Sequence, residues 1–140
     1  MTKQIYVNLP VADLAKATAF YEALGFKKNE MFSDEKGSGM EWSDEIVVML
    51  ITRDFYKTFL RGKEVADPAK SSGVLLSLSF DSKDDVQKFA DTAKANGGDY
   101  FKVDYGPTED MMFGYEVLDL DGNQWEPVWM NPNFNPQAKN

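Results

Sequence analysis

A strand and helix pattern that occurs twice constrains the fold of this chain more than any other feature. Within residues 4–26, apolar and more polar residues alternate from Ile5 to Leu9, which predicts a strand with one buried face. Apolar residues at spacings of three and four then predict an amphipathic helix, with Asp13 as its N-cap and Gly25 as its left-handed stop. The first stretch is thus predicted to be a strand followed directly by a helix.

The second half of the chain repeats this plan. Ser82 is placed to cap a second helix, and the pair Gly97 and Gly98 is placed to end it. The matching apolar positions are Ile5 and Val74, Val7 and Leu76, Leu9 and Leu78, Val11 and Phe80, Ala17 and Val86, and Phe20 and Phe89. Duplication of a module too small to hold a core alone is the simplest explanation, and chance similarity is the alternative.

Three further strands are predicted in each half, which gives two βαβββ modules. In the first half they cover residues 26–32, 40–42 and 46–51, and in the second half residues 100–105, 111–118 and 124–130. Over 140 residues we expect one domain spanning 1–130. Its parts are module one at about 4–60, a connection at 61–73, module two at about 74–130, and a frayed tail at 131–140.

Composition excludes several classes of function. The net charge of −8 and the absence of basic clusters argue against a nucleic-acid surface. The chain has no Cys and no His, which removes disulfides, thiolate nucleophiles and the usual catalytic triads. No apolar stretch approaches membrane-spanning length and no signal-peptide core precedes the first strand, so a cytoplasmic protein is expected.

Two segments resemble a known family. The run NLPVADLAKATAFYEALGF, the repeated βαβββ order and LDLDGNQWE near the end are similar to the vicinal oxygen chelate superfamily, over roughly residues 4–130. That superfamily includes glyoxalase I, bleomycin-resistance proteins and extradiol dioxygenases. The resemblance implies an α+β fold, with two βαβββ modules pairing into a curved, eight-stranded mixed sheet around a cup and helices outside. It also implies a homodimer.

Most residues at the metal-ligand positions of the family are not metal ligands in this sequence. In metal-dependent members, ligands lie on the first and last strands of each module, and the corresponding residues here are Tyr6, Met49, Leu75 and Glu126. Only Glu126 is a usual ligand, and the chain lacks the His and Cys that zinc prefers. We therefore expect neither a metal nor another cofactor in the cup.

Six residues are candidates for ligand binding on the cup side of the strands. They are Tyr6, Asn8, Met49, Leu75, Ser77 and Glu126. Glu126 is also the candidate catalytic residue, as a base or a cation anchor, and the alternative is a carboxylate left as scaffolding. Tyr6 and Asn8 would orient a ligand or only satisfy one another. Residues 111–115 are open between an apolar lip over the cup and ordinary core.

These residues support three hypotheses. The first is a metal-independent binding protein that holds a small cationic or aromatic molecule in the cup. The second is an enzyme, either a glyoxalase-like lyase or isomerase or an extradiol-type dioxygenase, using Glu126 and an unanticipated metal site. The third is a dimer or partner-binding unit without a ligand. The missing metal ligands and the acidic charge favour the first.

Overall fold

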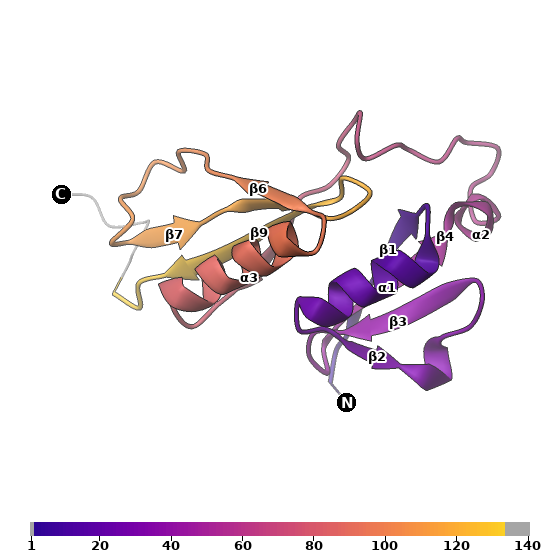
Figure 1. Ribbon diagram of the computed structural model, residues 1–140, viewed down its shortest axis with the longest axis horizontal. Coiled ribbons are helices and arrows are strands. Elements are labelled where there is room, and N and C mark those ends of the chain that lie inside the picture. Colours follow the sequence, from indigo (N-terminus) through magenta and orange to yellow (C-terminus); the bar gives the residue numbers. More distant parts are fainter. Residues whose placement is uncertain (1, 134–140) are drawn as a thin grey trace.

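The computed structural model describes residues 2–133 and contains two modules, each of which begins with a strand and a helix and continues with further strands (Figure 1). Module one consists of β1 (Ile5–Val11), α1 (Leu14–Ala23), β2 (Lys27–Asn29), the 3-10 helix η1 (Glu30–Phe32), β3 (Gly37–Glu41), β4 (Ile46–Thr52) and α2 (Arg53–Lys57). Module two consists of β5 (Leu76–Ser79), α3 (Lys83–Ala95), β6 (Asp99–Phe101), β7 (Met112–Gly114), β8 (Glu116–Leu118) and β9 (Gln124–Met130). Most of the predicted tail, residues 134–140, lies outside the described residues.

Each module forms its own mixed sheet. Module one has the strand order β1-β4-β3-β2, and module two has β5-β9-β8-β6 with β7 also paired to β9. In both sheets the first strand runs parallel to the last, so Asn8 lies opposite Met49 and Ser77 opposite Glu126. The predicted α+β class and the repeated module are confirmed. The strands form one four-stranded sheet in module one and one five-stranded sheet in module two.

Several strand boundaries differ from the prediction. The strand predicted at 26–32 ends at Asn29, whose side chain accepts a hydrogen bond from Met31 N and caps η1. The strand predicted at 111–118 is two strands, because Tyr115 N donates to the Pro127 carbonyl between the two ladders. The strand predicted at 100–105 is shorter in the structure, where β6 ends at Phe101. Local hydrogen bonds override strand propensity at these points.

The predicted helix ends are confirmed. The Asp13 side chain accepts from Lys16 N and the Ser82 hydroxyl accepts from Asp85 N, so both helices start at the expected caps. Gly25 has a φ of 107° and Gly97 a φ of 101°, the left-handed conformation that glycine adopts without a Cβ penalty.

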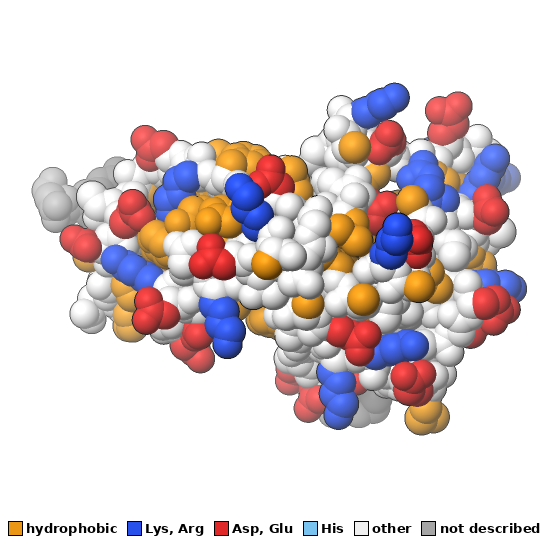
Figure 2. All heavy atoms as spheres, viewed as in Figure 1, with side chains coloured by type: hydrophobic (Ala, Val, Ile, Leu, Met, Phe, Trp, Pro, Cys, Tyr) orange, Lys and Arg blue, Asp and Glu red, His pale blue; other side chains and the backbone are white. Residues whose placement is uncertain are grey.

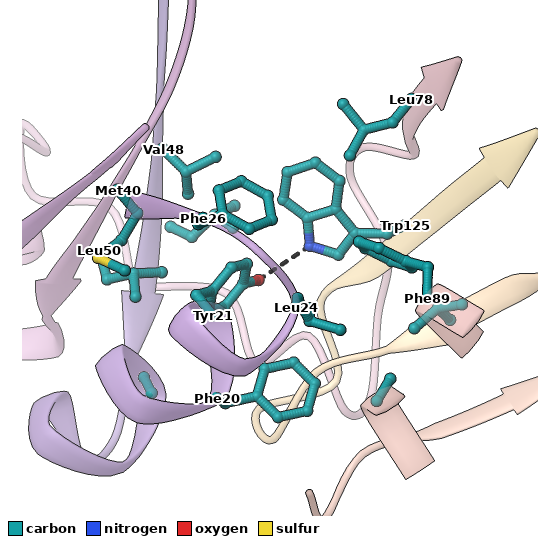
Figure 3. Packing of buried hydrophobic residues seen from close by; sticks show 14 of the residues in the cluster. Phe20, Tyr21, Leu24, Phe26, Met40, Val48, Leu50, Leu78, Phe89 and Trp125 are labelled. Atoms are coloured by element: carbon teal, nitrogen blue, oxygen red, sulfur yellow. Dashed lines mark hydrogen bonds between the residues drawn. The ribbon is translucent and has the colours of Figure 1, made fainter. Parts of the chain in front are cut away.

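One core joins the two modules. Phe20 and Tyr21 of α1, and Leu24 that caps its end, pack in the same buried cluster as Phe89 of α3 and Trp125 of β9 (Figure 3). Edge-to-face aromatic pairs cross the boundary, including Tyr21 with Trp125 and Trp42 with Phe89. The core therefore lies between the helices and one face of each sheet.

The connection between the modules is held at two points. Arg53 donates to the carbonyls of Val65 and Ala66. Farther along, the backbone of Ala69 lies so close to Gly122 that an added Cβ would be 2.9 Å from Ala69 N. Gly122 also has a φ of 98°, so this turn requires glycine for two reasons. No helix in the described part of the chain is long and apolar enough to cross a membrane.

Candidate functional site

The sheet faces opposite the helices carry the predicted site residues, and we call this side the open face. On β1 and β4, Leu9, Val11, Val48 and Leu50 belong to the core. The alternating residues Tyr6, Asn8, Val47 and Met49 therefore point the other way, because successive strand side chains face opposite sides. The cup side predicted from the alternation is the open face of module one.

The open face of module one contains a recess. A cavity of about 270 Å³ is lined by Gln4, Tyr6, Asn29, Phe32, Gly39, Glu41, Val47 and Met49. Gly39 leaves the space open, because an added Cβ would lie 3.1 Å from Phe32 Cβ and 3.5 Å from Met49 Sδ. Phe32 is placed there by η1, the helix turn that replaces the end of the predicted strand.

Polar groups are few in the recess. The Tyr6 hydroxyl donates to Gln4 Oε1 at 2.8 Å, and Gln4 Nε2 donates to the Asp44 carbonyl at 2.7 Å. Glu41 is the charged side chain among the lining residues. The recess thus combines aromatic and thioether surfaces with one carboxylate, which suits a flat apolar group bearing positive charge.

The open face of module two carries a hydrogen-bonded group of polar side chains. Ser77 Oγ donates to Glu126 Oε1 at 2.5 Å across β5 and β9. Next to this pair, Tyr105 donates to Glu116 Oε2 at 2.6 Å and Gln124 Nε2 donates to Glu116 Oε1 at 2.7 Å. Two strands therefore present two neighbouring glutamates on one face.

The pKa of Glu116, a carboxyl of this group, is raised above that of an ordinary glutamate. The residue is buried, with 3% of its surface exposed. Burial raises the pKa of Glu116, and the neighbouring Glu126 raises it further, while the bonds from Tyr105 and Gln124 act in the opposite direction. The pKa of Tyr105 is raised by its own burial and then by Glu116. The Glu116 carboxyl can therefore hold a proton at a higher pH than an ordinary glutamate.

The structure brings four of the six predicted residues together in two pairs and places the other two elsewhere. Tyr6 and Met49 line the recess, and Ser77 bonds to Glu126 in the other sheet. Asn8 lies opposite Met49 but lines a second cavity, between the modules. Leu75 precedes β5 with 52% of its surface exposed. Of residues 111–115, Tyr115 packs against the core and donates to Gln87 of α3, so it belongs to the helix side.

Three contributors were missed by the sequence reasoning. Glu116 and Tyr105 were not singled out, although Glu116 is an acid between Tyr115 and Val117 in a predicted strand, a signal that could have found it. Phe32 was assigned to a strand, and the Asn29 cap that turns the chain there was overlooked.

The residues do not fit the metal of the metal-dependent relatives. At the four corresponding positions, the Tyr6 hydroxyl already donates to Gln4 and one Glu126 oxygen already accepts from Ser77. Met49 and Leu75 offer no hard donor. Within residues 2–133, no group of three or more His, Cys, Asp and Glu side chains is arranged to hold an ion. The donor set at these four positions therefore does not match the ligands that such an ion requires.

Comparisons with known proteins place the chain in a family. The model of the Glyoxalase/Bleomycin resistance protein/Dioxygenase superfamily matches residues 3–126. No curated protein matches the chain. Among solved structures, a hypothetical protein from S. aureus is 26% identical with a TM-score of 0.74, and the match covers 92% of this chain and 94% of that chain.

Two other solved structures show the same fold at lower identity. A glyoxalase/bleomycin resistance protein/dioxygenase family enzyme from Burkholderia phytofirmans PsJN is 21% identical with a TM-score of 0.76, covering 93% of this chain and 100% of that chain. A bleomycin-binding protein complexed with bleomycin is 22% identical with a TM-score of 0.61, at 93% and 100% coverage. Because the family model spans most of the sequence, the chain belongs to the glyoxalase/bleomycin resistance protein/dioxygenase superfamily.

Proposed function

We propose that this protein binds a small aromatic, cationic molecule in the recess of module one without a metal ion. The observation that carries the proposal is the recess itself, where Tyr6 and Met49 line a cavity that Phe32 and Gly39 shape. A cavity of about 270 Å³ is slightly below the usual range for small-molecule sites, so a compact ring system fits best.

The chemistry of the recess selects the ligand class. Phe32, Tyr6 and Met49 offer aromatic and polarizable surfaces, and Glu41 offers the balancing charge. The net charge of −8 attracts cations to the whole molecule. On the face seen in Figure 2, acidic and basic side chains are interspersed over both modules, so selection must come from the local recess. The bleomycin-binding relative supports binding as a function of this fold.

A binding screen with a recess-filling variant tests the proposal. Compact planar aromatic cations are titrated by isothermal calorimetry against wild type, against Gly39→Leu and against the control Thr58→Leu, which is exposed and outside the recess. We expect saturable binding that Gly39→Leu weakens at least tenfold, that Thr58→Leu leaves unchanged and that a chelator does not alter. Binding that depends on added metal, or that survives Gly39→Leu, would contradict the proposal.

Assembly and location are proposed separately. We expect a homodimer, as the family resemblance implies. We also expect a cytoplasmic location, because the sequence shows no signal-peptide core before the first strand and no apolar stretch of membrane-spanning length. Sedimentation at several concentrations tests the dimer, and a single species of 15.8 kDa would argue against it.

An acid and base function is the second candidate, favoured by the pair Glu116 and Glu126. Two neighbouring carboxyls, one with a raised pKa, can hold and pass a proton, as a lyase or isomerase needs. Proton exchange of carbonyl compounds at carbon, followed by NMR in deuterated water, would reveal such an activity. It should vanish in Glu126→Gln and persist in Glu41→Gln.

A further inference from the structure

A second cavity lies between the two modules. It measures about 330 Å³ and is lined by Asn8, Leu9, Pro10, Tyr56, Ala66, Pro68, Ser71, Ser72, Gly73, Val74, Leu76, Gly122, Asn123 and Gln124. We call it the seam cavity. We propose that the seam cavity is a separate site for an uncharged small molecule carrying an amide-like pair of hydrogen-bond donor and acceptor.

The lining excludes charged ligands. None of the lining residues is charged, although 27% of the residues in the chain are. An ion placed here would lose its hydration without a countercharge, whereas a neutral polar molecule loses far less. The seam cavity therefore differs in ligand class from the recess, which contains Glu41.

Backbone groups of β1 supply part of the recognition. Ile5 N–H donates to the Glu45 carbonyl, so in this parallel pair Ile5, Val7 and Leu9 direct their backbone groups toward β4. The peptide groups of Asn8 and the carbonyl of Pro10 then face the opposite edge. β1 and β5 are both edge strands, and no ladder joins them within residues 2–133.

Backbone groups on this edge of β1 need hydrogen-bond partners outside their own sheet, as the next N–H along the edge shows. Ala12 N–H, the next donor on this edge, is bonded to Asp121 Oδ1 of module two at 2.9 Å. Asn8 N–H has no corresponding partner among the described residues, and it borders the seam cavity. An amide in the cavity can donate to one edge carbonyl and accept from Asn8 N–H, as a paired strand would.

Side chains complete a polar lining. Asn8, Ser71 and Tyr56 line the cavity, and their side chains carry hydrogen-bond donors and acceptors. Gln124 donates its Nε2 to Glu116, which leaves its carbonyl oxygen as an acceptor. Leu9, Leu76 and Val74 give the apolar surface that a ring would cover.

The cavity walls are fixed by contacts on both sides of the connection. Arg53 anchors the carbonyls of Val65 and Ala66, and Pro68 and Ala69 pack on Gly122. These contacts hold one wall of the cavity against the turn before β9. A preformed site requires less ordering when a ligand binds.

The test uses matched neutral and charged probes. Nicotinamide, uracil and N-acetylglycinamide are titrated into ¹⁵N-labelled protein, together with nicotinate, orotate and N-acetylglycine. We expect at least one neutral probe to give saturable shifts at Asn8, Ser72 and Gln124, and its charged analogue to bind at least tenfold more weakly.

Variants separate this site from the recess. Gly73 lines the cavity and a Cβ there meets no atom within 4 Å, so Gly73→Trp adds an indole without a clash at Cβ and should block the cavity. Lys70→Trp, on the same connection but outside the lining, should leave binding unchanged, as should Gly39→Leu in the recess. Ser71→Leu serves as a second blocking variant if Gly73→Trp loses its native spectrum.

Three results would overturn the proposal: no saturable shift with any neutral probe, equal binding of the charged analogues, or shifts confined to Gly39 and Met49. Failure of the recess experiment alone would leave this site standing, because Gly39→Leu does not touch its lining.

Discussion

The Trp125 indole N–H donates to the Tyr21 hydroxyl at 2.8 Å, which links β9 of module two to α1 of module one (Figure 3). The same hydroxyl donates to Asp119 Oδ2 at 2.6 Å, and Asp119 also accepts from Asn123. The buried Tyr21 hydroxyl thus connects α1 of module one to the turn at residues 119–123 of module two. Burial and the charge of Asp119 raise the pKa of Tyr21, so the phenol stays neutral.

Replacing Tyr21 by Phe should therefore destabilise the whole fold. The variant keeps the ring but leaves the Trp125 N–H and one Asp119 oxygen less satisfied in the core, at a cost of about 1–3 kcal/mol. Urea unfolding measures the effect, and Tyr6→Phe, at an exposed tyrosine, is the matched control. Equal midpoints for Tyr21→Phe and wild type would show that this link contributes little.

Gly122 and Gly73 should respond oppositely to alanine. Gly122→Ala forces a side chain into a left-handed backbone and against Ala69, which should cost about 1–3 kcal/mol of unfolding free energy. Gly73→Ala meets open space and should change stability by about 0.5 kcal/mol or less. Thermal and urea unfolding of both variants checks this, and a neutral Gly122→Ala would refute the close packing of the connection.

Stability should fall as the pH rises past the ordinary glutamate range. The folded Glu116 carboxyl keeps its proton to a higher pH than the unfolded one, so between those two pKa values the native state binds more protons. Unfolding free energies measured from about pH 4 to about pH 8 should show this slope, and Glu116→Gln should reduce it. Asp121, whose pKa burial also raises, should keep part of the slope in that variant.

Two variants should move the Glu116 pKa in opposite directions. Glu126→Gln removes a neighbouring acid that raises it, so the pKa should fall, although burial keeps it above the ordinary value. Tyr105→Phe removes a bond to the carboxylate, so the pKa should rise. Carboxyl ¹³C titration by NMR reads both shifts.

Glu41→Gln in module one is the control for these titrations, and it should leave the Glu116 pKa where it is in wild type. Shifts of the same sign in Glu126→Gln and Tyr105→Phe would contradict the network described on the open face of module two.

Some of the molecule was predictable from sequence because its causes are local. The caps at Asp13 and Ser82, the left-handed Gly25 and the alternation in β1 depend on residues a few positions apart. Asn8 and Ser77 occupy corresponding positions of the repeat, 69 residues apart, and each lies opposite the last strand of its module. The βαβββ order and the family followed from these patterns.

Tertiary structure decided the sites, because they depend on segments that are distant in sequence. Phe32 reaches the recess only because Asn29 caps η1 and Gly39 leaves room, and neither fact follows from strand propensity. The raised pKa of Glu116 results from burial and from the neighbouring Glu126 on β9. The seam cavity needs both modules and the connection in place. Sequence periodicity determines which face a residue takes, whereas packing determines which residues share a cavity.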